Sequence, residues 1–122
     1  MNNDLNNDLN DYASECHRAN IQWWEDPHTG APITRNFGEL IALAHSELSE
    51  ALEGHRKGLM DDKLPHRPMV EVEIVDCLIR LFDLSHAFGF DLEGAYRDKM
   101  NYNAIRPDHR PENRIKEGGK RY

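Results

Sequence analysis

The sequence predicts an all-α fold, a four-helix bundle built around an antiparallel hairpin of two long helices. Apolar residues recur three and four positions apart through four segments, which is the spacing of one helix face. No segment alternates apolar and polar residues in the manner of a half-buried strand. The two longest segments are joined by residues 59–67, and a connection this short places consecutive helices side by side and antiparallel.

The first helix is expected from about Leu5 to about Trp24. A segment of residues 26–32, rich in Pro, Gly, Asp and Thr, follows it and reads as a loop. The apolar face of this helix comprises Leu5, Leu9, Tyr12, Ala13, Cys16, Ala19 and Trp23.

The second helix has clear signals at both ends. Asn36 can cap its start, and Glu39 three residues later gives a pattern like a capping box. Basic Arg56 and Lys57 in the last turn precede Gly58, where the helix should stop.

The third and fourth helices follow in quick succession. The third should run from about Pro68, a residue suited to a first turn, to about Phe88, with Gly89 ending it. Asp91 can cap a fourth helix that continues to about Asn103.

Length and charge predict one domain over residues 1–122, with a core at about 5–104 and an extended basic tail at 105–122. The formal net charge is −7, but residues 1–90 carry −9 and residues 91–122 carry +2. An acidic body argues against general nucleic-acid binding, which needs a basic surface. It allows a phosphate substrate if bound cations invert the local charge.

The cellular compartment is predicted from what the chain lacks. No apolar run approaches the roughly 18 residues that a membrane span needs, and the acidic N-terminus does not resemble a secretory signal. Cys16 and Cys77 lie far apart without CxxC spacing, which favours a reduced cytoplasmic environment and packing roles. The histidines lack the spacing of a zinc site.

Four carboxylates inside the hairpin are the most informative residues. Glu47 and Glu50 are three apart on the second helix, and Glu73 and Asp76 are three apart on the third. Residues at this spacing share a helix face, so each pair can present two carboxylates to one cation. Both pairs lie at similar depth from the connecting loop, at about 1.5 Å per residue. Four such charges would repel each other, so Mg²⁺, with Mn²⁺ as a possible substitute, is the implied cofactor.

The alternative is that these carboxylates are solvated surface, as glutamate pairs on amphipathic helices usually are. The third helix argues against this, because it is apolar over most of its circumference and should be central in the fold. Its charged residues form one narrow stripe, at Glu73, Asp76, Arg80 and Asp83. Glu53 and Glu71 project elsewhere and are expected on the surface.

The segments Ser46-Glu47-Leu48-Ser49-Glu50 and Glu73-Ile74-Val75-Asp76 resemble the EExxE…ExxD signature of the all-α NTP pyrophosphohydrolases, the MazG and dCTP pyrophosphatase superfamily. Ser46 replaces the first glutamate, which leaves four acidic positions. Trp24-Glu25 is similar to an aromatic-acidic pair of the base pocket in some members. Residues 99–107 resemble the KxxYNxxRP segment of small MazG-like proteins. The resemblance covers roughly residues 20–110.

This resemblance implies a Mg²⁺-dependent enzyme that converts an NTP or dNTP to the monophosphate and pyrophosphate, in nucleotide-pool house-cleaning. Glu47, Glu50, Glu73 and Asp76 would be the catalytic metal ligands, with Glu47 or Glu50 doubling as the base. The implied substrate-binding residues are Trp24 for the base, Lys99 and Arg106 for phosphate, and Tyr102 and Asn103 for the sugar or phosphate. Trp23 is the second candidate for the base, but it fits the apolar stripe, so packing is the preferred interpretation.

Two alternatives remain open. One is a related enzyme of the same chemistry, such as a phosphoribosyl-ATP pyrophosphohydrolase. The other is a catalytically silent helical dimerisation module, in which Ser46 marks the loss of activity. A homodimer or homotetramer is expected in either case, because the apolar third helix needs more cover than one short chain gives.

Overall fold

The computed structural model describes residues 7–106 and residue 112. Within this part the chain is helical, with only isolated β-bridges, which confirms the predicted all-α class. Its helices are α1 (Leu9–Ala19), the short 3₁₀ helix η2 (Ile21–Trp23), α2 (Phe37–Lys57), α3 (Met69–Ala87) and α4 (Leu92–Ile105). None of these helices combines the length and the apolar character that crossing a membrane would require.

Local signals set the ends of the hairpin helices where the sequence predicts them. The Asn36 side chain accepts a hydrogen bond from the backbone N–H of Glu39 and so caps α2. Gly58 ends α2 in the left-handed conformation, with φ +62°. Pro68 precedes the first residue of α3, and Gly89, with φ +73°, follows its last turn.

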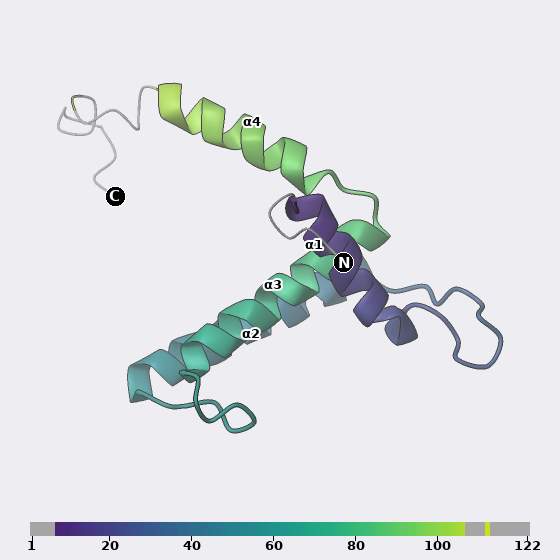
Figure 1. Cartoon of the computed structure of the whole chain (residues 1–122), viewed down its shortest axis with the longest axis horizontal. Coiled ribbons are helices and arrows are strands. Elements are labelled where there is room, and N and C mark those ends of the chain that lie inside the picture. Colours follow the sequence, from purple (N-terminus) through teal and green to yellow (C-terminus); the bar gives the residue numbers. More distant parts are fainter. Residues whose placement is uncertain (1–6, 107–111, 113–122) are drawn as a thin grey trace. The chain divides into compact units, whose positions relative to one another are not determined.

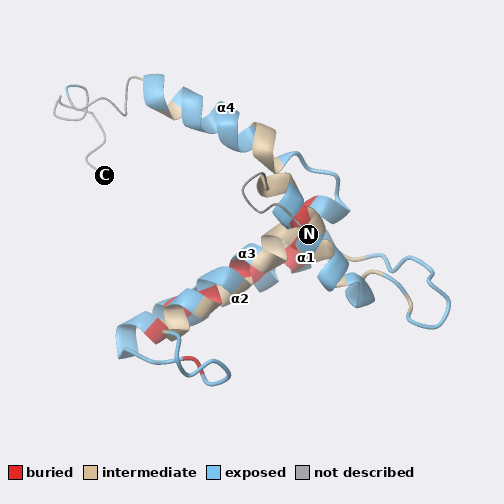
Figure 2. Ribbon diagram, viewed as in Figure 1, coloured by how far each residue is buried: buried red, intermediate tan, exposed pale blue. Residues whose placement is uncertain are grey.

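The two long helices form the predicted antiparallel hairpin (Figure 1), and α3 packs against both α2 and α1. Small residues allow the close approach: a Cβ added at Gly54 would lie 2.8 Å from Cγ of Met69. The buried positions concentrate along the hairpin and where α1 meets it, while most outward positions are exposed (Figure 2). The buried apolar residues are Ala13, Leu40, Ala44, Ala51, Cys77 and Leu84.

The first helix is shorter than predicted. It begins at Leu9, directly after the N-cap residue Asp8, and ends at Ala19. The side-chain amide of Asn20, the next residue, donates a hydrogen bond to the carbonyl of Cys16. The chain then continues as η2 rather than as the α-helix expected to reach Trp24. The predicted start near Leu5 lies outside the described residues.

The chain divides into two compact units, one up to Phe90 and one from Asp91 onward. The second unit contains α4, which Asp91 caps through the backbone N–H of Gly94, as predicted. Since α4 belongs to a separate unit, its inclusion in one bundle with the other helices stays a prediction.

The hairpin leaves large apolar side chains exposed. Leu48 and Leu52 of α2 are 50% and 57% exposed, and Ile74, Val75 and Leu78 of α3 are 44–49% exposed. The expected apolar faces of both helices are therefore only partly covered within one chain.

Candidate metal centre and adjoining pocket

Three of the four predicted carboxylates converge across the hairpin. Glu47 of α2 and Glu73 and Asp76 of α3 each offer a carboxylate oxygen, and these oxygens lie within 4.8 Å of one another. Glu50 is exposed and is not a member of this group, although its charge acts on Glu73. Ser46, at the position of the missing glutamate, donates its hydroxyl to the Leu43 carbonyl at 2.6 Å.

Glu73 is the most confined of these carboxylates. Its residue is 8% exposed, and its Oε2 atom is buried without a hydrogen-bond partner. The pKa of Glu73 is raised from 4.5 to about 8, and burial is the largest cause of this rise. The other causes are hydrogen bonds that only the protonated acid can make to Glu47 and Glu50, and repulsion by the charges of these two groups.

Asp76 is perturbed in the same direction. Burial is the largest cause that raises its pKa, followed by the charge of Glu47, while the positive charge of Arg80 opposes the rise. Arg80 donates from Nε to Oε1 of Glu47 at 3.1 Å, which joins α3 to α2 beside the cluster. Three acidic groups therefore share this place with one adjacent guanidinium.

The donor set fits Mg²⁺ or Mn²⁺. All three groups are carboxylates, and hard oxygen ligands are what these cations prefer. The buried, unpartnered oxygen of Glu73 supplies a second reason, because an orphaned anionic oxygen is costly until a cation or proton satisfies it. Glu47, Glu73 and Asp76 would hold the ion, with Glu50 close to Glu73.

Glu53 and Glu71 are surface groups, as predicted. Glu53 pairs with Lys57, one turn along α2, at 2.6 Å, and Glu71 of α3 pairs at 3.4 Å with Arg67, which lies just before that helix. Cys77, adjacent to Asp76, is buried in the core, as expected from its angle on the helix.

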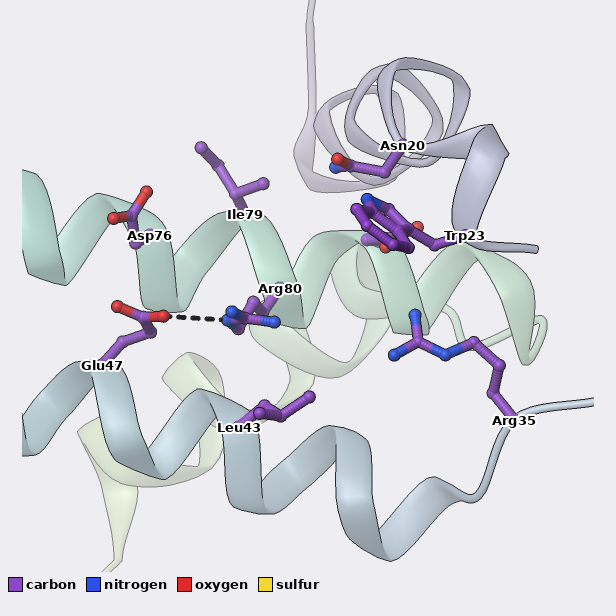
Figure 3. A pocket seen from close by; sticks show the side chains of 9 residues that line it. Asn20, Trp23, Arg35, Leu43, Glu47, Asp76, Ile79 and Arg80 are labelled. Carbon is purple, nitrogen blue, oxygen red and sulfur yellow. Dashed lines mark hydrogen bonds and ion pairs between the residues drawn. The ribbon is translucent and has the colours of Figure 1, made fainter.

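A pocket of about 460 Å³ adjoins the carboxylates. In Figure 3, Glu47 and Asp76 lie at one end, Trp23 and Arg35 lie at the other, and Arg80 lies between them. Its walls come from the α1–η2 segment, the start of α2 and the middle of α3. The lining residues are Asn20, Trp23, Arg35, Leu43, Glu47, Asp76, Ile79, Arg80 and Asp83.

The two tryptophans line different pockets. Trp23 is 60% exposed and lines this pocket, so the interpretation of Trp23 as core packing is wrong. The 3₁₀ turn explains the difference, because its 120° step per residue redirects the side chain from the face that a continuous α-helix would give it. Trp24 instead lines a second pocket of about 370 Å³, together with Glu25. Base stacking by Trp24 stays a prediction.

Asp83 is the centre of a partly buried polar cluster whose other members the sequence did not indicate. Its carboxylate accepts from Nε1 of Trp24 at 2.9 and 3.1 Å and lies 2.8 Å from Nδ1 of His17. The Arg35 guanidinium lies over the Trp24 ring, 5.1 Å from its centroid. His17 and Asp83 are 66 residues apart, so sequence spacing could not link them. The stripe position of Asp83 was the one available signal.

The remaining predicted substrate residues belong to the second unit. The cations of Lys99 and Arg106 lie 5.0 and 6.0 Å from the ring centroid of Tyr102, and Oδ1 of Asn103 is buried without a hydrogen-bond partner. The motif thus gathers its two cations around one aromatic ring. Their role in substrate binding stays a prediction, and Pro107 lies outside the described residues.

No family model, curated protein or solved structure matches this chain. The resemblance to the MazG superfamily therefore stays a prediction carried by its motif residues. Among residues 7–106 and 112, the geometry itself gives one group of possible metal ligands, and this group contains only carboxylates.

Proposed function

We propose that this chain is a Mg²⁺-dependent nucleoside triphosphate pyrophosphohydrolase that converts an NTP or dNTP to the monophosphate and pyrophosphate. The observation that carries the proposal is the convergence of Glu47, Glu73 and Asp76, together with the buried, unpartnered Oε2 atom of Glu73. A pocket of about 460 Å³ adjoins them, within the usual size range of small-molecule sites.

The residues of the cluster have distinct parts in this proposal. Glu47, Glu73 and Asp76 hold the cation, and Glu50 supports Glu73 from the exposed side. When bound, the cation screens the triphosphate and lowers the pKa of a coordinated water. Glu47 or Glu50 would accept the proton of the attacking water; the new bond would form at the α-phosphorus, and the bond to the bridging oxygen would break with pyrophosphate as the leaving group.

The other end of the pocket suits a nucleoside. Trp23 offers an exposed aromatic face for stacking, and Arg35 and Asn20 offer polar groups beside it. The Nδ2 group of Asn20 is engaged with Cys16, which leaves its Oδ1 as an acceptor for a base N–H. We therefore assign the nucleobase to the Trp23 side and the phosphates to the carboxylate side.

The proposal includes a homodimer or homotetramer. The exposed apolar residues of the hairpin are the basis, since Leu48, Leu52 and Val75 are each about half exposed in one chain. Light scattering at micromolar concentration should give a multiple of the 14.2 kDa chain mass. A monomer mass would refute this part of the proposal.

The activity is tested by incubating the protein with each NTP and dNTP plus Mg²⁺ and separating the products by chromatography. We expect a monophosphate and pyrophosphate, and no activity after chelation of the metal. A diphosphate as the first product would contradict attack at the α-phosphorus. A protein without activity and without a Mg²⁺-dependent rise in melting temperature would instead be the silent helical module.

A further inference from the structure

Arg80 lies at the junction between the carboxylate cluster and the pocket (Figure 3). Its side chain is 41% exposed, whereas that of its partner Glu47 is 12% exposed. The bond to Glu47 uses Nε, and this leaves the Nη groups of the guanidinium for a ligand in the pocket that Arg80 lines. If Arg80 served only to link α3 to α2 through Glu47, it would not need to line this pocket.

The partner of Arg80 is also a proposed metal ligand. In the metal-free protein, Arg80 stands beside the negative charges of Glu47 and Asp76 and offsets part of their repulsion. A divalent cation held by the same carboxylates would repel the guanidinium and weaken the attraction of Glu47 for it. Metal binding should therefore loosen the contact between Arg80 and Glu47.

An arginine loosened here is well placed for an anion. The pocket runs from the carboxylates past Arg80 to Trp23 and Arg35. A substrate whose phosphates meet the metal and whose base meets Trp23 must cross the position of Arg80. The planar guanidinium matches phosphate oxygens with two parallel donors, which a lysine cannot do.

We propose that Arg80 binds substrate phosphate oxygens, and that Glu47 holds it in the metal-free protein and releases it when a divalent cation binds. This inference rests on the proposed metal site and substrate class. It makes Arg80 a substrate-binding residue in addition to a partner of Glu47. It also couples the two ligands, because the metal frees the residue that the phosphate needs.

The test uses Arg80→Gln and Arg80→Lys in the full chain, with two probes measured by calorimetry. The first probe is Mn²⁺ alone, and the second is inorganic tripolyphosphate in the presence of saturating Mn²⁺, which avoids any choice of base. Arg67→Gln is the matched control, because it breaks another Arg–Glu pair on the exposed surface of the hairpin. Thermal melting verifies that each variant folds. If Arg80→Gln does not fold, Arg80→Lys provides the test, because it keeps the positive charge but loses the two parallel donors of the guanidinium.

We expect Arg80→Gln to bind Mn²⁺ as tightly as the wild type or more tightly, because a competitor for Glu47 is gone. Its affinity for tripolyphosphate should fall about 10- to 100-fold, the usual effect of losing a charged hydrogen-bond partner. Arg80→Lys should lose less, and Arg67→Gln should match the wild type for both probes.

Parallel losses of Mn²⁺ and tripolyphosphate affinity in Arg80→Gln would overturn the inference, since they mean that Arg80 only positions Glu47. Unchanged tripolyphosphate affinity would overturn it as well. The proposed function is judged separately by nucleotide hydrolysis. If the wild type hydrolyses nucleotides and Arg80→Gln has the same kcat/KM, the role of Arg80 is refuted but the proposed function is not. If Arg80→Gln loses tripolyphosphate binding and the wild type hydrolyses no nucleotide, the proposed function is refuted but the role of Arg80 in binding phosphate is not.

Discussion

Two sets of carboxylates on the same two helices have opposite surroundings. Glu53 and Glu71 point outward, and each pairs with a basic residue four positions away in the sequence, Lys57 and Arg67 respectively. Glu73 points into the hairpin, where its nearest charged neighbours include the carboxylates of Glu47 and Glu50. The outer set is satisfied by neighbours close in the sequence, whereas the inner set exists only because α2 and α3 pack together.

This difference separates a solvated face from a candidate site. Exposed ion pairs contribute little to stability, because water and salt screen them. Carboxylates gathered in a partly buried place raise one another's energy until a proton or a cation is bound. The inner set therefore destabilises the protein when no cation is bound and favours the binding of a positively charged ligand.

The largest effect is expected for Asp76→Asn. Asparagine keeps the shape but removes a negative charge and a strong metal ligand, so activity should fall at least about 1,000-fold, as the loss of several kcal/mol of transition-state stabilisation implies. The melting temperature of the metal-free variant should equal or exceed that of the wild type, since repulsion within the cluster is eased. Wild-type turnover of Asp76→Asn at saturating Mg²⁺ would show that the assignment of the metal site is wrong.

Glu47→Gln and Glu50→Gln should differ, although sequence spacing treats them alike. Glu47 belongs to the converging group and Glu50 is exposed beside it. We expect a loss of activity of at least about 100-fold for Glu47→Gln and of about 10-fold for Glu50→Gln, a size typical of groups that support metal ligands. Mn²⁺ titrations of both variants should follow the same order. Equal losses would make Glu50 a direct ligand, as the sequence predicted.

The metal-free protein should lose stability as the pH rises from about 5 to about 8. The pKa of Glu73 is raised from 4.5 to about 8 in the folded chain, so the folded state binds more protons than the unfolded state within this window. The free energy of unfolding then decreases with rising pH, by at most about 1.4 kcal/mol per pH unit for one group. Melting temperatures measured in chelator across this range should show the decline.

Two controls sharpen this pH test. Glu73→Gln should flatten the decline, because the titrating group is removed; an unchanged slope would mean that other groups cause it. Saturating Mg²⁺ should also oppose the decline, since metal binding requires the deprotonated carboxylates and strengthens as they ionise. The pKa of Asp76 is raised as well, so a residual slope of the same sign in Glu73→Gln is expected.

Much of the fold could be predicted because its signals are local. Asn36, Gly58, Gly89 and Asp91 mark helix ends through hydrogen bonds or backbone angles that involve only a few neighbouring residues. The end of α1 was missed because its apolar spacing continues past the point where the backbone changes to a 3₁₀ turn. That single change moved Trp23 from the predicted core to the wall of the pocket.

Only the part of the site that depends on residues sharing one helix face could be predicted from the sequence. Spacing of three residues paired Glu73 with Asp76 correctly, because both project from one helix. It could not show that α2 turns Glu47 inward and leaves Glu50 exposed, since that depends on the rotation of one helix against another. The contact of His17 with Asp83 depends on packing between α1 and α3, which no local pattern encodes.

The smallest effect is expected for Glu53→Gln, the outer counterpart of Asp76→Asn. Both substitutions remove one negative charge and keep the shape of the side chain. Glu53 pairs with Lys57, and the two side chains are 46% and 65% exposed. Loss of this pair should therefore move the melting temperature by no more than about 2 °C. Activity and Mn²⁺ affinity should stay at wild-type values, because the side chain of Glu53 is directed to Lys57 and is not a member of the converging group. Enzyme assays, melting curves and metal titrations run side by side with Asp76→Asn test the contrast directly. If Glu53→Gln lost activity as severely as Asp76→Asn, the active face of α2 would be the outer one, and the inner carboxylates would be a feature of packing alone.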